Sequence, residues 1–377
     1  MNNTMPLDKT KFIDFGITPL LKKCELDRLK TKFLPVVVRK FSHVPLDVIE
    51  DITFLTSDSD FCLALQKLSS QARDEFFAED DEFRAQQFQI VANQPRMFYT
   101  FRKILEIALK DLPDVCTQPI DEEQELMADA KIAHVVCSLL VSGSDILEVF
   151  AKKLSYEPCL MELFARFVKE AKPGYFEDTA GLGTKIILDP IMTIIHNCAS
   201  FKSNRGRLVQ AGVLDELKPY LEKQDGIHES EIVQSVAFIA DDEDAQLFKM
   251  KREVITDDLV VKLKECMKSE RRKAGGWNVL ELIKGLGRLA LNGDNRAVMR
   301  ECGVVTLMLD LMRSKVKSEQ YEALCALWTL SRDPTMNNTI AADSDAIRRI
   351  TELSSESPKD PQEVAVGLLE NIKRIEI

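Results

Sequence analysis

The architecture of this chain can be worked out from two neighbouring segments, Asn295-Arg-Ala-Val-Met-Arg-Glu-Cys-Gly303-Val-Val-Thr-Leu-Met308 and Ala323-Leu-Cys-Ala-Leu-Trp-Thr-Leu-Ser331. Gly303 interrupts the first segment, and apolar residues on either side recur every three or four positions, as they do on one face of a helix. The first segment therefore predicts a short helix, a tight corner at Gly303 and a second helix. The second segment predicts a third, more apolar helix.

The same pattern returns elsewhere in the C-terminal half. Residues 204–217 repeat it with Gly212 at the corner, 91 residues before Gly303. Residues 248–263 lie midway, with Asp258 in the position of the glycine, and residues 338–350 form a fourth copy with Ser344 at the corner. Helical spacing extends over most of the chain, which predicts an all-α protein. Repeats of about 40–50 residues indicate a solenoid, in which each unit buries its apolar face only by stacking on the next.

A third helix follows each corner, and one position in it can be aligned through all copies. The spacing between successive copies is 41, 50, 41 and 42 residues, and the longest interval contains the basic, glycine-containing insertion 271–276, which we interpret as a loop. The aligned residues are Asn197, Phe238, Arg288, Thr329 and Asn371.

Residues 185–375 resemble armadillo repeats, most continuously over 286–334. The resemblance implies an all-α, right-handed armadillo-like helical-repeat solenoid with a concave face formed by the third helices. We expect armadillo repeats over 185–377, irregular or degenerate helical repeats over 1–171, and a loop over 172–184, where Pro173, Gly174, Gly181 and Gly183 cluster.

The resemblance also points to candidate binding residues. In armadillo proteins that bind extended peptides, the aligned position is typically Asn, often with Trp four residues earlier. Here no Trp occupies the earlier position, so the Asn–Trp ladder used for nuclear-localisation peptides is broken. Lys284 and Arg288, one helical turn apart, form either a basic spot for a carboxylate or phosphate or a solvated pair. The candidates on the concave face are Asn197, Phe238, Lys284, Arg288, Thr329 and Asn371.

The two tryptophans are considered separately because aromatic residues can anchor a partner. Trp328 lies beside Leu324 and Leu327, and we interpret it as a core residue. Trp277 opens a helix after Gly275 and Gly276, and either role fits it.

Composition excludes several classes of function. The chain has 377 residues and a net charge of −11, which argues against general nucleic-acid binding. Its four His and nine Cys form no metal-ligand or catalytic constellation, so we predict no metal site, no cofactor and no enzymatic activity. The scattered cysteines and the polar N-terminus predict a cytoplasmic protein, and no apolar run is long enough for membrane insertion.

Two functional hypotheses remain. The first is a non-enzymatic scaffold or adaptor that binds a protein or peptide partner on the concave face. The alternative is a ligand-sensing regulatory armadillo module that restrains an effector partner, for example of the TIR type, through a phosphate-bearing metabolite near Arg288. The sequence leaves the oligomeric state open.

Overall fold

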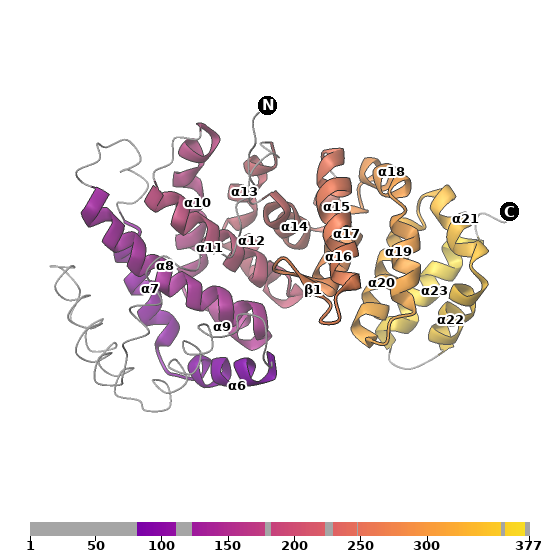
Figure 1. The fold of residues 1–377 in the computed structure, drawn as a ribbon, viewed down its shortest axis with the longest axis horizontal. Helices are drawn as coiled ribbons and strands as arrows, with labels where there is room; N and C mark the ends of the chain where they lie inside the picture. The colour runs from indigo at the N-terminus through magenta and orange to yellow at the C-terminus, as the bar shows by residue number, and fades with distance from the viewer. Residues whose placement is uncertain are drawn as a thin grey trace. The chain divides into compact units, whose positions relative to one another are not determined.

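The computed structural model describes residues 81–110, 123–177, 182–222, 229–246, 248–355 and 359–373. Regular structure in these ranges is helical apart from one two-stranded hairpin, which confirms the all-α prediction (Figure 1). The chain divides into two compact units, Met1–Tyr220 and Leu221–Ile377. Much of the predicted N-terminal region, residues 1–80 and 111–122, lies outside the described residues.

The first unit is built from helices that come in groups of three. Helix α11 packs along α8, so these two occupy equivalent third positions in successive groups. The η5 turn is tied to α10 because the Tyr220 hydroxyl donates to the Val168 carbonyl at 2.6 Å. The elements are α6 (Asp81–Ala92), α7 (Met97–Ala108), α8 (Glu123–Ile146), α9 (Glu148–Tyr156), α10 (Leu160–Glu177), α11 (Leu182–Ala199), η4 (Lys202–Asn204), α12 (Arg205–Gln210), α13 (Val213–Leu217) and η5 (Lys218–Glu222).

The predicted loop over 172–184 is wrong at both of its described ends. Helix α10 continues through Pro173 to Glu177, and α11 begins at Leu182. The helix survives the proline because the aromatic residues beyond it are packed. The rings of Tyr175 and Phe176 lie 5.0 and 5.6 Å from the ring of Tyr220. This packing outweighs the hydrogen bond that proline removes from the helix.

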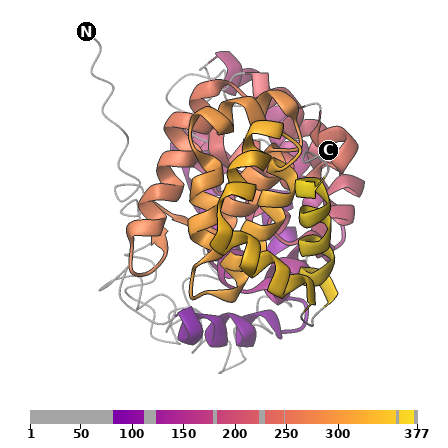
Figure 2. The same cartoon turned by 90° about the vertical axis from the view of Figure 1, so that its right-hand side faces the viewer.

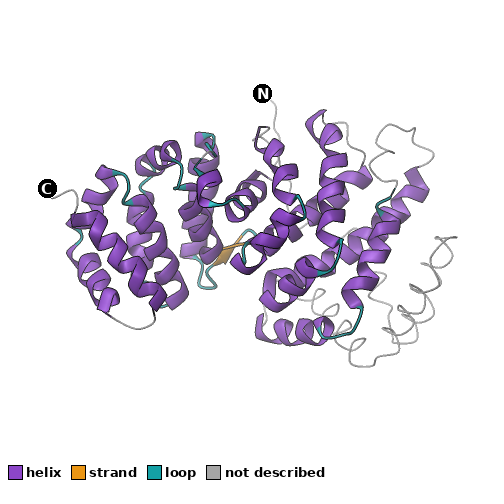
Figure 3. Ribbon diagram, turned by 180° about the vertical axis from the view of Figure 1, so that it is seen from behind, coloured by secondary structure: helices purple, strands orange, loops and turns teal. Residues whose placement is uncertain are grey.

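The second unit continues the three-helix groups, and Figure 3 marks its hairpin as the sheet among the helices. Its third helices, α14, α17, α20 and α23, pack successively against one another. The elements are α14 (Glu229–Ile239), α15 (Asp242–Ala245), η6 (Val254–Leu259), α16 (Val260–Lys268), β1 (Lys273–Ala274), β2 (Trp277–Asn278), α17 (Val279–Leu289), α18 (Gly293–Glu301), α19 (Val304–Met312), α20 (Lys317–Leu330), α21 (Pro334–Ala342), α22 (Ser344–Ser355) and α23 (Lys359–Lys373).

Two glycine corners form as predicted. Gly212 precedes α13 with φ of 76°, and Gly303 precedes α19 with φ of 71°. This left-handed conformation is open to glycine at little cost and disfavours side chains with a Cβ. The chain therefore turns sharply at these two positions and starts the second helix of each group.

The other two predicted corners are wrong. Asp258 lies inside η6, a π-helical turn that leads directly into α16, so no corner interrupts the chain there. Without glycine, the left-handed turn is unfavourable and the helix continues instead. In the last copy the corner is Asp343, whose side chain accepts from the Ala346 backbone N–H at 2.9 Å, and Ser344 is already helical.

The buried side chains of the second unit form one continuous core between its helices. The helices of the last groups lie in front in Figure 2. Trp277, 4% exposed, belongs to this core at the start of α17. Its ring faces the Lys262 ammonium at 4.7 Å. Its buried side chains include Leu263, Leu282, Leu286, Met299, Met308, Leu324, Leu327, Ile340, Ile350 and Leu368. This continuity is what a stack of mutually dependent repeats requires.

Candidate functional site

The candidate residues of the second unit lie on its third helices. We call their outward side the third-helix face and define it by Lys284, Arg288, Glu322, Trp328, Thr329, Gly367 and Asn371. These residues come from α17, α20 and α23, which are neighbours in the fold. Lys284 and Glu322 connect α17 to α20, and Trp328 and Gly367 connect α20 to α23.

Trp328 is the most exposed aromatic side chain on this face. It is 39% exposed, so the expectation that it is a core residue is wrong. Its neighbours Leu324 and Leu327 point inward, whereas the indole is turned toward α23. A Cβ added at Gly367 would lie 2.8 Å from the indole ring, so the ring is seated on the bare backbone of Gly367. The missing side chain at residue 367 leaves room for the ring, while part of Trp328 stays open to solvent.

A carboxylate and an ammonium group lie one to two turns away on the same face. Lys284 on α17 and Glu322 on α20 approach within 3.9 Å. Burial raises the pKa of Glu322, and the Lys284 ammonium offsets only part of this effect. The Lys284 ammonium is therefore paired with a carboxylate of α20. This pairing fits neither the basic spot nor the solvated pair that the sequence suggested.

Arg288 is not a free basic group either. Its Nε donates to the Ala237 carbonyl at 2.9 Å, and one Nη donates to the Ala240 carbonyl at 2.7 Å. The other Nη pairs with the carboxylate of Asp242. These two carbonyls lie at the C-terminal end of α14, where helix carbonyls lack partners within the helix and carry partial negative charge. The Arg288 side chain thus caps α14, which removes the observation behind the ligand-sensing alternative.

The last two candidates of this face are also engaged in internal hydrogen bonds. The Asn371 amide donates to the Ser331 hydroxyl at 2.9 Å, and its backbone carbonyl accepts from the Asn337 amide at 2.8 Å. The Thr329 hydroxyl donates to the Cys325 carbonyl within its own helix at 3.3 Å. The Asn371 amide is therefore committed within the fold.

Asn197 and Phe238 complete the candidate set and are both buried. Asn197 lies on α11 of the first unit, where its amide donates to the Val141 carbonyl at 3.1 Å and to the Ser144 hydroxyl at 3.2 Å. Phe238 lies on α14 of the second unit and is 9% exposed. Neither side chain presents an open surface to a partner.

A shared role emerges for three of the aligned residues. Asn197, Arg288 and Asn371 each reach back to the C-terminal end of the preceding third helix, which is α8, α14 or α20 respectively. Alignment found these positions correctly, but the resemblance suggested a contact with a ligand. Their polar groups stabilise the stack instead. Burial is the missing information, since a sequence pattern does not reveal which helix end lies behind a side chain.

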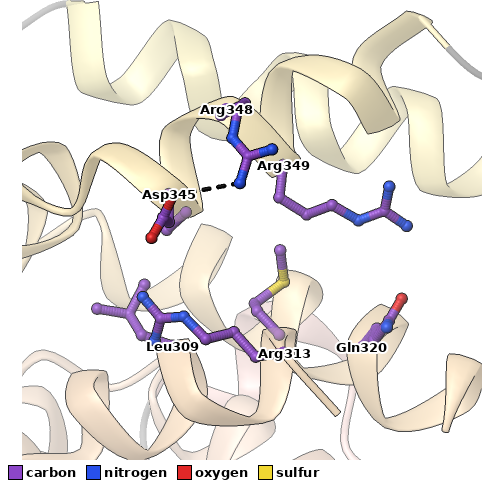
Figure 4. A pocket seen from close by; sticks show the side chains of 8 residues that line it. Leu309, Arg313, Gln320, Asp345, Arg348 and Arg349 are labelled. Carbon is purple, nitrogen blue, oxygen red and sulfur yellow. Dashed lines mark hydrogen bonds and ion pairs between the residues drawn. The ribbon is translucent and has the colours of Figure 1, made fainter. Parts of the chain in front are cut away.

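A small cavity of about 300 Å³ lies between α19, α20 and α22 (Figure 4). It is lined by Leu309, Met312, Arg313, Gln320, Asp345, Ala346, Arg348 and Arg349. The arginines already have carboxylate partners. Arg313 pairs with Asp343 at 2.5 Å, and Arg348 pairs with Asp345 at 3.2 Å. The cavity therefore has no surplus of positive charge for an anion.

Two further searches bear on chemistry and on membranes. Within the described ranges, no group of three His, Cys, Asp or Glu side chains is placed to hold a metal ion. No helix in the same part of the chain is both long and apolar enough to cross a bilayer.

The geometry now decides the type of repeat. Each regular group has a short first helix, a left-handed glycine corner, a second helix and a third helix stacked on its predecessor. The fold is armadillo-like. No protein-family model and no curated protein matches the sequence.

Solved structures give only remote likenesses to this armadillo-like chain. One is the designed armadillo repeat protein YIII(Dq)4CqI, 15% identical over 70% of this chain and 99% of that one, with a TM-score of 0.38. Another is a designed armadillo repeat protein in complex with peptide (KR)4, at 18% identity, 70% and 99% coverage, and a TM-score of 0.36. A third comes from a study of a phosphorylation switch that controls the interaction between cadherin and beta-catenin. It is 13% identical over 95% of this chain and 77% of that one, with a TM-score of 0.42. With such low TM-scores, only the repeat geometry above carries the fold.

Proposed function

We propose that this protein is a non-enzymatic scaffold that binds an extended segment of a partner protein on the third-helix face. The observation that carries the proposal is the exposed indole of Trp328, held on Gly367. A large apolar ring that is fixed in position and half open to water loses little conformational entropy on binding. Such rings are the usual energetic centres of protein interfaces.

The surroundings of the ring favour side-chain recognition over a backbone ladder. The Asn371 amide and the Thr329 hydroxyl already hydrogen-bond within the protein, so neither group is available for the ladder that binds a peptide backbone. The Lys284–Glu322 pair lies on the same face and is partly exposed, so it can contact polar groups beside the apolar anchor. We infer a partner segment with an apolar or aromatic residue that stacks on Trp328.

A cytoplasmic location belongs to the same proposal. None of the six cysteines in the described ranges forms a disulfide bond. Thiols without disulfide bonds, three of them buried, suit a reducing compartment, where disulfides do not persist. Fractionation of cells that express the tagged chain tests this part, and recovery from the secreted fraction would contradict it.

The binding proposal is tested by selecting peptides from a displayed random library against the intact chain and measuring their affinity. Trp328→Ala is expected to weaken the selected peptides by at least about thirtyfold, as for a central interface residue. The matched control is Tyr156→Ala, because Tyr156 is an aromatic residue of the first unit with 53% exposure. Equal losses in the two variants, or none in Trp328→Ala, would overturn the proposal.

A further inference from the structure

Two loops of the second unit carry exposed basic side chains close together. One is the hairpin between α16 and α17, with Lys268 just before it (Figure 1). The other joins α19 to α20. We name the group the basic edge and define it by Lys268, Arg271, Lys273, Lys315 and Lys317, all of which are exposed.

An ion pair with a buried carboxylate connects these loops. Arg272 of the hairpin donates two hydrogen bonds to the carboxylate of Glu319, from Nε at 3.0 Å and from one Nη at 2.7 Å. The Ser314 hydroxyl of the second loop donates to the same carboxylate at 2.5 Å. Since Glu319 is 3% exposed, this contact works as an internal clamp. The basic side chains on both sides of the clamp are thereby held on one edge.

The positive charge of this edge is only partly balanced. In the described part of the chain, no carboxylate pairs with Lys268, Arg271, Lys315 or Lys317. The exposed acidic residues beside them are Glu265 and Glu270, so a local surplus remains in a chain of net charge −11. Opposite signs on different parts of one molecule orient it toward an anionic surface.

The chemistry of the edge distinguishes a diffuse anionic surface from a defined carboxylate ligand. Four of the five residues are lysines, which act as flexible point charges, whereas arginine forks suit carboxylates of fixed geometry. Of the two arginines of the hairpin, Arg272 is already bound to Glu319, and Arg271 is the one that is exposed. Val316, between Lys315 and Lys317, is 42% exposed, and the hairpin tip is formed by Gly275 and Gly276. A cluster of exposed basic side chains is typical of a surface that binds anionic lipid headgroups.

We propose that the basic edge docks this protein on membranes that contain anionic phospholipids. The contact is peripheral: lysine ammonium groups lie among the headgroups, and the loop tips reach the interfacial layer. This docking does not depend on the third-helix face, so a partner segment and a membrane can be bound together. A scaffold of this kind would concentrate its protein partner at a negatively charged membrane.

Vesicle flotation with the full chain tests the proposal. Wild type is expected to float with vesicles containing 30% phosphatidylserine and to stay unbound with pure phosphatidylcholine, and high salt is expected to release it. The test variant is Arg271→Glu/Lys273→Glu/Lys315→Glu/Lys317→Glu. Its binding is expected to fall by at least about a hundredfold, since each basic residue near an anionic surface contributes several-fold.

A matched control separates the edge from net charge. Replacing Lys152, Arg166, Lys169 and Lys202 by Glu changes the net charge equally, and these residues are exposed on the first unit. The control is expected to bind far better than the test variant. Equal losses in both variants would overturn the proposal, as would no binding of wild type. Capture of a polyglutamate peptide without vesicle binding would assign the edge to acidic protein segments and also overturn it.

Discussion

The groups α15–α17 and α18–α20 are neighbours in one stack, yet they are held together differently. The second has a capped first helix, the Gly303 corner and a short loop before α20. The group α15–α17 begins with a helix of only four residues and has no glycine corner. It contains a π-helical turn, and a hairpin replaces the short loop before its third helix. Where these local signals are missing, side chains of the neighbouring elements supply the hydrogen bonds.

Asn295 is one such side chain. It is fully buried on α18, but it serves the irregular segment before η6. Its Oδ1 accepts from the Met250 backbone N–H at 2.8 Å, and its amide donates to the Phe248 carbonyl at 2.8 Å and to the Leu289 carbonyl at 3.0 Å. Backbone groups that a regular first helix would satisfy internally are satisfied here by one amide.

The largest effect is expected from Asn295→Leu. The substitution removes the side-chain partner of the Met250 N–H and of the Phe248 carbonyl, and it removes one of the two donors to the Leu289 carbonyl. This loss is expected to cost about 3–5 kcal/mol of unfolding free energy. Urea unfolding followed by circular dichroism measures it. Asn338→Leu is the control, since Asn338 is an exposed asparagine of helix α21. A loss below about 1 kcal/mol in Asn295→Leu would break the comparison.

Arg272→Met is expected to rank second. It strands the carboxylate of Glu319 in the core, and the free energy of unfolding falls by about 2–4 kcal/mol. The neighbouring variant Lys273→Met changes the same hairpin without touching Glu319 and is expected to lie within about 0.5 kcal/mol of wild type. The double variant Arg272→Met/Glu319→Met is expected to recover most of the loss, because no unpaired charge remains. No recovery would mean that the hairpin depends on more than this pair.

Gly303→Ala tests the regular group and is expected to cost about 1–2 kcal/mol, because alanine is disfavoured at the left-handed corner. Gly206→Ala is the counterpart: Gly206 lies in helix α12, and no atom lies within 4 Å of the added Cβ. That change is expected to be neutral or to stabilise by up to about 1 kcal/mol. Equal melting temperatures for the two variants would show that the corner does not strain an alanine.

The smallest effect is a pH dependence of the Arg272–Glu319 clamp. Burial alone would raise the pKa of Glu319, but hydrogen bonds from Arg272 and Ser314 outweigh burial and hold the pKa below its ordinary value of 4.5. A depressed carboxyl pKa adds stability above pH 4.5, and this stability is lost as the pH falls through the folded value. Melting temperatures between pH 7 and 3 should drop more steeply for wild type than for the double variant. Parallel curves would exclude the clamp as a source of acid sensitivity.

The sequence predicted what local signals encode. The third helices and the corners at Gly212 and Gly303 carry helical spacing and glycine, and both were predicted correctly. Asp258 and Ser344 were misplaced as corners because alignment counts positions, whereas the π-helical turn and the Asp343 cap depend on local hydrogen bonds. The repeat pattern therefore predicts the overall architecture, but it does not predict the local backbone where a repeat departs from the pattern.

The candidate site was harder to predict, because its residues are defined by contacts between repeats. Trp328 looked like a core residue beside Leu324 and Leu327, but its ring lies partly exposed against Gly367, 39 positions later, where a side chain would collide with it. Arg288 looked like a ligand for anions, but it caps a helix end in the preceding repeat. Both outcomes depend on which residues stack across helices, which spacing along one helix does not encode.

Quenching of Trp328 fluorescence tests the proposed binding face most directly. The chain has two tryptophans, so Trp277→Phe leaves Trp328 as the sole reporter. Acrylamide is expected to quench this variant readily when it is free and at least about threefold less when a selected peptide is bound, because the partner covers the ring. Quenching that is unchanged by a saturating peptide would contradict binding on the third-helix face.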